Sequence, residues 1–205
     1  MIRLPKNKKP SKLMPELLAS QATVIQLSGV NPRSIMGPDW WKLERAKALA
    51  NAGFHCICCG TNSADLTSPL EGHEVYEIDY EKAVMTYKHT VAVCKLCHAA
   101  IHNKRLVTMH SRKQLRLKEL QNVYRYAKNV WKTAYPDKPL PHQIKYLHCY
   151  IKTRDVKLAR QLHSDMPSHQ PWNAWRLAFN SKLYPPKFTS FPQLQCYYIG
   201  APYAD

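Results

Sequence analysis

Four of the seven cysteines form two CxxC pairs, a spacing that is typical of a metal site. Two residues separate Cys56 from Cys59, and two separate Cys94 from Cys97. This short spacing lets the backbone turn so that both sulfurs of a pair face one ion. Two such pairs supply the four thiolates that a tetrahedral structural zinc needs. We therefore expect a structural Zn²⁺ held by these four cysteines.

The three remaining cysteines are not expected to be the primary zinc ligands. Cys58 lies inside the first pair and is an alternative ligand, ranked below Cys56 because "CICCG" ends in the Gly60 that usually follows such a turn. Cys149 and Cys196 are expected to pack in the interior. The N-terminus lacks the apolar core of a secretory signal, so the expected compartment is the reducing cytoplasm, where cysteines serve as metal ligands rather than disulfides.

A histidine-rich motif points to a second metal site. Between the cysteine pairs, "LEGHEV" over 70–75 places His73 beside Glu74. After the second pair come His98 and His102, four residues apart. Residues at this spacing project from one face of a helix toward a common point. We therefore predict a divalent ion near these histidines.

Two enzymatic interpretations of His73 and Glu74 fail on spacing. A zinc protease of the HExxH type needs a second histidine four residues after the first, but Glu77 stands there. A zinc nucleobase deaminase needs HxE followed by PCxxC, whereas here the glutamate is adjacent to the histidine and the second pair is "VCKLC".

The elements that must position these residues follow from the local pattern. A helix is predicted over 40–52, with Asp39 as N-cap and Gly53 as its stop. β-Branched and aromatic residues in "LEGHEVYEIDY" and "AVMTYKHTVAVC" predict two strands joined near Glu81 and Lys82. The segment "KLCHAAIHNKRL" predicts a helix. The predicted order is strand, strand, helix.

A long basic helix is predicted next, over 111–135, because apolar residues recur there at intervals of three and four. Cations gather toward its other face: Lys118, Arg125, Lys128 and Lys132. The segment "YPDKPLP" ends this helix with three prolines. Beyond it, short helices are expected near 144–151 and 155–163, followed by an aromatic tail. A short helix is also expected near 15–26.

These motifs together resemble the HNH endonuclease family, in its subtype with a four-cysteine zinc. The resemblance covers about Trp40 to Arg105 and rests on the order and spacing of the helix, "CICCG", "LEGHEV", "HTVAVC" and "CKLCHAAIH". It implies a ββα unit that binds one divalent ion, Mg²⁺, Mn²⁺ or Ni²⁺, and a histidine on the first strand that activates water to attack a phosphodiester.

Site residues are carried over by position. His73 matches the first residue of the family's His-His or Asp-His pair, a metal ligand, and Glu74 matches the second, the general base. His89 falls near the central Asn position, which orients the base or shapes the loop. His98 and His102 match the metal ligands of the final helix. The chain departs from the family pattern at Glu74 and at His89.

The departure at Glu74 leaves three alternatives open. A neutral histidine has a pKa near ~6.5 and suits proton abstraction at neutral pH, whereas a carboxylate near ~4.3 is a weaker base unless burial raises its pKa. Glu74 is therefore a base with a raised pKa, or a metal ligand that leaves His73 as the base, or the mark of an inactive site. We expect His73 to matter most in either active arrangement.

The fold class expected from these elements is α+β. A zinc-stapled ββα core follows one helix, and a long helix and a small, mainly helical C-terminal region come after it. The predicted parts are a basic arm over 1–38, a nuclease domain over 39–110, a basic connecting helix over 111–135 and a recognition region over 136–205.

The charge balance suggests a polyanionic partner. Thirty Lys and Arg against fourteen Asp and Glu give a formal charge of +16. The first hypothesis is a metal-dependent DNA endonuclease, like free-standing homing or phage-type enzymes, with duplex DNA as its partner and no membrane. The second is an inactive zinc module that binds nucleic acid or protein. The third is a nuclease or binder of RNA.

Overall fold

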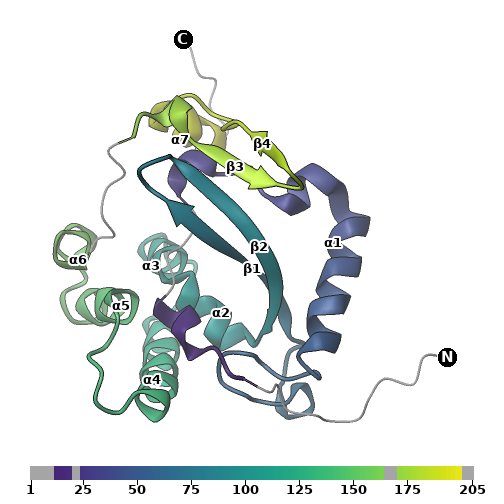
Figure 1. Cartoon of the computed structure of the whole chain (residues 1–205). Helices are drawn as coiled ribbons and strands as arrows, with labels where there is room; N and C mark the ends of the chain where they lie inside the picture. The colour runs from purple at the N-terminus through teal and green to yellow at the C-terminus, as the bar shows by residue number, and fades with distance from the viewer. Residues whose placement is uncertain (1–11, 20–23, 164–169, 200–205) are drawn as a thin grey trace. The chain divides into compact units, whose positions relative to one another are not determined.

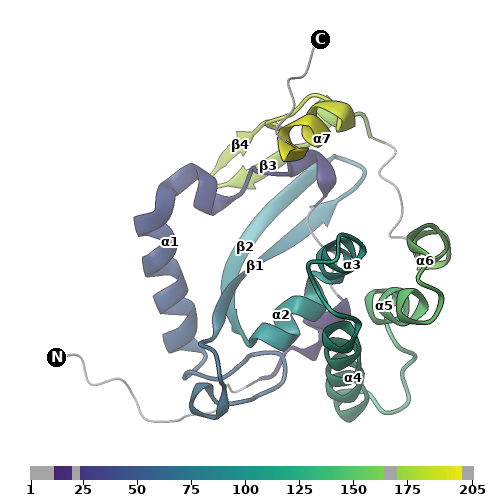
Figure 2. The ribbon, with the colours of Figure 1, turned by 180° about the vertical axis from the view of Figure 1, so that it is seen from behind.

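The computed structural model describes residues 12–19, 24–163 and 170–199, and it has the mixed α+β architecture expected from the sequence (Figures 1 and 2). The basic residues from Arg3 to Lys9 lie outside the described part. The helices are α1 (Pro32–Asn51), α2 (Lys95–Ile101), α3 (Asn103–Ser111), α4 (Leu117–Ala134), α5 (His142–Thr153), α6 (Val156–His163) and α7 (Phe191–Ile199). The strands are β1 (Glu71–Asp79), β2 (Val84–Val93), β3 (Arg176–Phe179) and β4 (Lys182–Tyr184).

The chain forms two compact units that are interleaved along the sequence. Unit 1 comprises 1–22, 47–73 and 91–167, and unit 2 comprises 23–46, 74–90 and 168–205. The parts predicted from the sequence are consecutive, so their boundaries do not coincide with those of the compact units. Unit 1 contains both cysteine pairs and the three histidines of interest.

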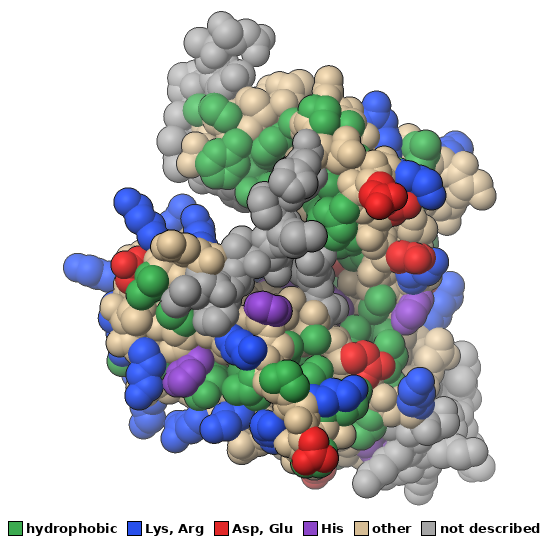
Figure 3. Space-filling view, turned by 60° about the vertical axis from the view of Figure 1, so that its left-hand side comes forward, with side chains coloured by type: hydrophobic (Ala, Val, Ile, Leu, Met, Phe, Trp, Pro, Cys, Tyr) green, Lys and Arg blue, Asp and Glu red, His purple; other side chains and the backbone are tan. Residues whose placement is uncertain are grey.

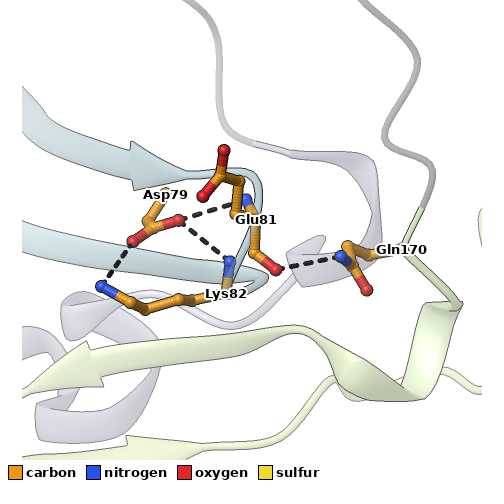
Figure 4. Close-up of polar contacts among 4 residues, drawn as sticks. All are labelled: Asp79, Glu81, Lys82 and Gln170. Carbon is orange, nitrogen blue, oxygen red and sulfur yellow. Dashed lines mark hydrogen bonds and ion pairs between the residues drawn. The ribbon is translucent and has the colours of Figure 1, made fainter.

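The predicted hairpin is present as β1 and β2, and a tight turn sets its end. The Asp79 carboxylate accepts hydrogen bonds from the N–H groups of Glu81 and Lys82, at 3.1 and 2.9 Å, and pairs with the Lys82 ammonium at 3.2 Å (Figure 4). The amide of Gln170 donates to the Glu81 carbonyl at 2.9 Å. Short polar side chains that bind the backbone in this way favour a turn over continued strand.

The C-terminal region adds two strands that the sequence analysis did not predict. The sheet has the order β1-β2-β3-β4, with β3 parallel to β2 and antiparallel to β4. Trp175, Leu177 and Phe179 alternate along the chain and are 0%, 0% and 5% exposed. Because alternate residues of a strand point to one face, this spacing buries all three on the same side of the sheet.

Those three side chains form the core of unit 2 with residues from its other segments. Met85 of β2 and Leu27 are buried with them, and the partly buried Trp40 of α1 packs on the cluster. The Trp40 ring meets the Phe179 ring edge to face, with centroids 5.7 Å apart. An aromatic core of this kind stabilises a small sheet through buried area and edge-to-face contacts.

Unit 1 is built from helices. Helix α2 packs on α4, α4 on α5 and α5 on α6, while the short 3-10 helix η1 (Pro15–Ala19) packs on α2, α4 and α5. The least exposed of its large side chains are Leu18, Leu70, Val93, Ile101, Val107, Leu120, Tyr146 and Leu147. None of the helices in the described part of the chain is both long and apolar enough to cross a membrane.

Four predicted helices differ in their bounds. The single helix predicted for "KLCHAAIHNKRL" is divided at His102 into α2 and α3. The helix expected over 111–135 is α4, which begins only at Leu117, because Lys113 takes a left-handed conformation (φ 60°) and Glu119 accepts the Arg116 N–H. Helix α1 begins at Pro32 rather than at residue 40, and Gly37 (φ 84°) interrupts it. The helix expected near 15–26 is two short 3-10 helices, η1 and η2 (Ile25–Leu27).

Candidate metal centres

The four cysteines of the two CxxC pairs meet in unit 1, as their spacing predicts. One ligand atom from each of Cys56, Cys59, Cys94 and Cys97 lies within 4.8 Å of the others. A tetrahedral zinc with Zn–S bonds of about 2.3 Å separates its sulfurs by roughly 3.8 Å. The Sγ atoms of Cys59 and Cys94 are 3.9 Å apart. The quartet therefore has the ligand type and the dimensions to hold a structural metal ion.

Backbone hydrogen bonds bring the two pairs together. The Ile57 N–H donates to the Ala92 carbonyl at 2.9 Å, which ties the first pair to the end of β2. Gly60 closes the turn after this pair with φ 78° and donates to the Cys56 carbonyl. Cys94 caps α2, since its sulfur accepts the Cys97 N–H at 3.4 Å.

The four cysteines of the quartet shift one another's pKa values through hydrogen bonds between their sulfurs. Hydrogen bonds from Cys56 lower the pKa of Cys59 and lower that of Cys94 to about 7. The hydrogen bond with Cys59 raises the pKa of Cys56. The hydrogen bond with Cys56 raises the pKa of Cys97. Four thiolates at this separation need a cation between them, which a structural metal supplies.

Two hydroxyl groups support the quartet, and sequence analysis did not find them. The Tyr126 hydroxyl of α4 donates to the Cys59 sulfur at 3.1 Å. The Thr61 hydroxyl lies 3.2 Å from the same sulfur and 3.4 Å from the Tyr126 hydroxyl. Groups that bind the ligands of a metal orient them. Thr61 has a local signal, two residues after Cys59, but Tyr126 is too far along the chain to have one.

Cys58 is 1% exposed but does not belong to the quartet. Its thiol hydrogen-bonds to Cys97 and raises the pKa of that residue. Cys58 thus packs beside the quartet. Cys149 and Cys196 are partly buried and lie apart from the potential metal-binding groups in the described residues.

A second potential metal-binding group contains the three predicted histidines. His73 of β1, His98 of α2 and His102 at the end of α2 each offer a nitrogen, and these atoms all lie within 4.8 Å of one another. The ring centroids are 5.3 Å apart for His73 and His98, 5.1 Å for His73 and His102, and 4.8 Å for His98 and His102. Three imidazoles converging in this way can bind one divalent ion.

The protonation of the cluster favours metal binding. Burial, followed by the charges of His102 and His98, lowers the pKa of His73 to about 3. Burial, followed by the charges of His98 and Arg105, lowers the pKa of His102 to about 4. Both imidazoles are therefore neutral at pH 7, with a lone pair available, and a neutral imidazole is the form that binds a metal.

Glu71 is a site residue that sequence analysis missed. Its carboxylate lies 2.5 Å from Nδ1 of His98, which leaves Nε2 of that ring for an ion. A carboxylate behind a ligand histidine fixes the ring and raises its basicity. One signal in the sequence could have identified Glu71. It stands two residues before His73 on a predicted strand, and residues two apart on a strand share a face.

Glu74 lies on the other face of β1 from His73, because neighbouring strand residues alternate. Burial, followed by the Glu74 charge, raises the pKa of Tyr76. Burial also raises the pKa of Tyr87, and the Glu74 charge is a minor further cause there. Both tyrosines belong to unit 2. Glu74 is not a member of the histidine group.

His89 is exposed on β2 and is not part of either potential metal-binding group. The acids concentrated between Asp65 and Glu81 do not form a cation site within the described residues. Some of them form pairs instead, since Glu77 contacts the Lys88 ammonium at 2.6 Å and Asp79 contacts Lys82.

The four predicted nucleic-acid contacts are all exposed on α4 but are not equivalent. Lys118 and Arg125 line a cleft, whereas Lys128 does not. The Lys132 ammonium donates to the carbonyls of Pro136 and Lys138, at 2.8 and 3.0 Å, and so closes the turn after α4. Lys and Arg side chains gather over the helices of unit 1, at the lower left of Figure 3.

Comparison with protein-family models, with curated proteins and with solved structures finds no match to this chain. Its function is therefore inferred from the geometry of its own residues.

Proposed function

We propose that this chain is a metal-dependent endonuclease of the HNH type that cleaves DNA phosphodiester bonds. The observation that carries the proposal is the convergence of His73, His98 and His102, with Glu71 behind His98, next in the chain to a four-cysteine frame. Sequence motifs and three-dimensional proximity select the same histidines. The frame and the cluster both belong to unit 1.

The chemistry divides among these residues. His73, His98 and His102 would hold the divalent ion, which supplies Lewis-acid stabilisation to the scissile phosphate and the leaving oxygen. Glu71 keeps the His98 ring in its ligating orientation. Lys and Arg side chains of unit 1 would neutralise the phosphates on either side of the cut.

The proton of the attacking water requires a base. Of the two side chains considered, His73 faces the histidine cluster, whereas Glu74 projects from the opposite face of β1. This arrangement favours His73, rather than the adjacent Glu74, as the residue that acts at the ion. Glu74 then acts on the opposite face of β1, where its charge affects Tyr76 and Tyr87.

The proposal is tested by incubating the purified chain with supercoiled plasmid and Mg²⁺, Mn²⁺ or Ni²⁺. We expect nicking that disappears in His73→Ala and His98→Ala. The matched control is His89→Ala, an exposed histidine outside the cluster, which keeps its activity. Absence of cleavage with every ion in a zinc-loaded wild-type chain contradicts the proposal.

Glu74→Gln tests whether Glu74 is the general base. Loss of a general base costs roughly 10²–10⁴-fold in rate. We expect Glu74→Gln to retain most of the nicking rate, while His73→Ala does not. A loss of this size in Glu74→Gln would assign the role of general base to Glu74.

The second candidate function is an inactive HNH-like zinc module that binds nucleic acid or protein. The observation that favours it is the placement of Glu74, which leaves the family's base position without a side chain on the face of His73. Metal-independent DNA binding without cleavage of plasmid or single-stranded RNA would support this candidate.

A further inference from the structure

A cleft of about 850 Å³ lies in unit 1 beside the cysteine quartet. Its walls come from the loop at Thr61–Ser68, from the start of α2 and from the exposed side of α4. The lining includes Leu66, Leu96, Ala99, Leu106 and Val123, so much of the interior is apolar. The volume falls within the range of sites that bury small organic groups.

The rim of this cleft is basic. Lys95, Lys118 and Arg125 line it, are exposed, and form no ion pair within the described residues. Two acids also line it, but Glu119 is occupied, since its carboxylate accepts the Arg116 N–H at 2.9 Å. The other is Asp65. The Arg116 hydrogen bond and, to a smaller extent, the Lys95 charge lower the pKa of Glu119, whereas Lys118 and Arg125 are free of ion pairs in the described part of the chain. Exposed cations over an apolar lining suit a ligand with a flat apolar body and an anionic backbone.

One aromatic ring in the lining is held rigidly. Tyr126 is partly buried, and its hydroxyl donates to the Cys59 sulfur at 3.1 Å. A ring fixed at its tip loses little rotamer freedom when a ligand packs against it, so it is a preorganised platform for a base. The structural metal frame thereby supports one wall of the cleft.

We propose that this cleft binds a single-stranded segment of nucleic acid. One base lies in the apolar interior against Tyr126, and the neighbouring phosphates contact Lys118 and Arg125 of α4. Base stacking joined to backbone neutralisation is the usual chemistry of single-strand binding. An acidic peptide would satisfy the cations but would leave the apolar interior without a flat partner.

The cleft is separate from the histidine cluster, so this binding does not depend on cleavage. None of the three histidines lines it. In a nuclease, such a site would hold an unpaired strand near the point of cutting, and in an inactive module it would be the binding site itself.

The test measures fluorescence anisotropy of a short labelled oligo(dT) with the zinc-loaded full chain, without added divalent ions. Ala99→Phe fills the apolar interior without changing charge. We expect it to weaken binding roughly tenfold, the scale of one stacked base. Asn122→Glu, an exposed substitution in the same lining, should weaken binding too, and it keeps the test valid if Ala99→Phe fails to fold.

The charge contribution has a matched control on one helix. Lys118→Ala and Arg125→Ala should each lower the salt dependence of binding by about 0.7 in log–log slope. Lys128→Ala removes the same charge from an exposed site outside the cleft and should leave the affinity near that of the wild type.

Three outcomes would overturn the inference. The first is an equal loss of affinity in Lys118→Ala and Lys128→Ala, together with no loss in Asn122→Glu. That result would indicate that the oligonucleotide binds to the basic surface as a whole rather than to the cleft. Another is tighter binding of a glutamate-rich peptide that displaces the oligonucleotide. The third is wild-type affinity in folded Ala99→Phe. His98→Ala distinguishes the two proposals, because it should abolish nicking and retain oligonucleotide binding.

Discussion

Glu71 determines which nitrogen of His98 is available to an ion. Its carboxylate occupies Nδ1, so Nε2 is the nitrogen that remains for an ion. The ring would otherwise rotate about its side-chain bonds, and part of the binding energy of the ion would be spent on ordering it.

Replacing Glu71 with alanine should weaken divalent-ion binding at the histidine cluster about 10–100-fold, the usual cost of losing such a partner. Glu71→Gln should lose less, because the amide oxygen still accepts a hydrogen bond from Nδ1. Calorimetric titration of Ni²⁺ into the zinc-loaded chain measures the effect. Glu77→Ala is the control, since Glu77 lies on the same strand and pairs with Lys88. Unchanged affinity in Glu71→Ala would remove Glu71 from the site.

Tyr126→Phe keeps the ring and deletes the hydroxyl that donates to Cys59. A hydrogen bond to a charged acceptor contributes about 1.5–3 kcal/mol. We expect a lower free energy of unfolding and faster loss of zinc to a chromogenic chelator. Tyr124→Phe, on the same helix with its ring stacked on His148, should release zinc at the wild-type rate. Equal release rates in both variants would show that Tyr126 does not support the metal site.

At the scale of elements, α4 links the core of unit 1 to its basic surface. Leu120, Val123, Ala127 and Trp131 are its buried residues. Tyr126 faces the cysteine quartet from the same helix, while Lys118 and Arg125 line the cleft. The packing of α4 therefore positions both the hydroxyl group that supports the cysteine quartet and one wall of the cleft.

Leu120→Ala should destabilise unit 1 by about 2–5 kcal/mol, because it opens a cavity at a side chain that is fully buried. Chemical denaturation followed by circular dichroism measures the loss. Lys128→Ala on the exposed face of the same helix should stay close to the wild type. A neutral Leu120→Ala would mean that α4 is not packed as described.

At the scale of the whole molecule, the two units have different sources of stability. Unit 1 surrounds a cysteine quartet, whereas unit 2 has an aromatic core of sheet and helix residues. Structural metal sites contribute directly to the free energy of folding, since the unfolded chain has no preformed site.

Removing zinc with a strong chelator should therefore unfold unit 1 in preference to unit 2. Amide hydrogen exchange should show loss of protection in α2 and α4 before loss in β3. Cys56→Ser should reproduce this pattern, and Cys149→Ser, which changes a cysteine that lies apart from the quartet, should not. Uniform loss of protection along the chain would indicate that the two units fold as one.

The local features of this protein could be predicted from neighbouring residues along the chain. CxxC spacing identified the quartet, and the four-residue interval of His98 and His102 placed both on one helical face. β-Branched and aromatic residues marked the two strands of the hairpin, joined near Glu81 and Lys82. These features depend on neighbours within a few residues, so they can be inferred from composition and periodicity.

The distant residues that support these features were found only in the folded structure. Tyr126 reaches Cys59 across 67 positions of sequence, and β3 joins β2 from the far end of the chain. The cleft exists because a loop, α2 and α4 pack together. No periodic signal specifies such contacts, because they depend on how whole elements pack, and packing is set by the combined burial of many side chains.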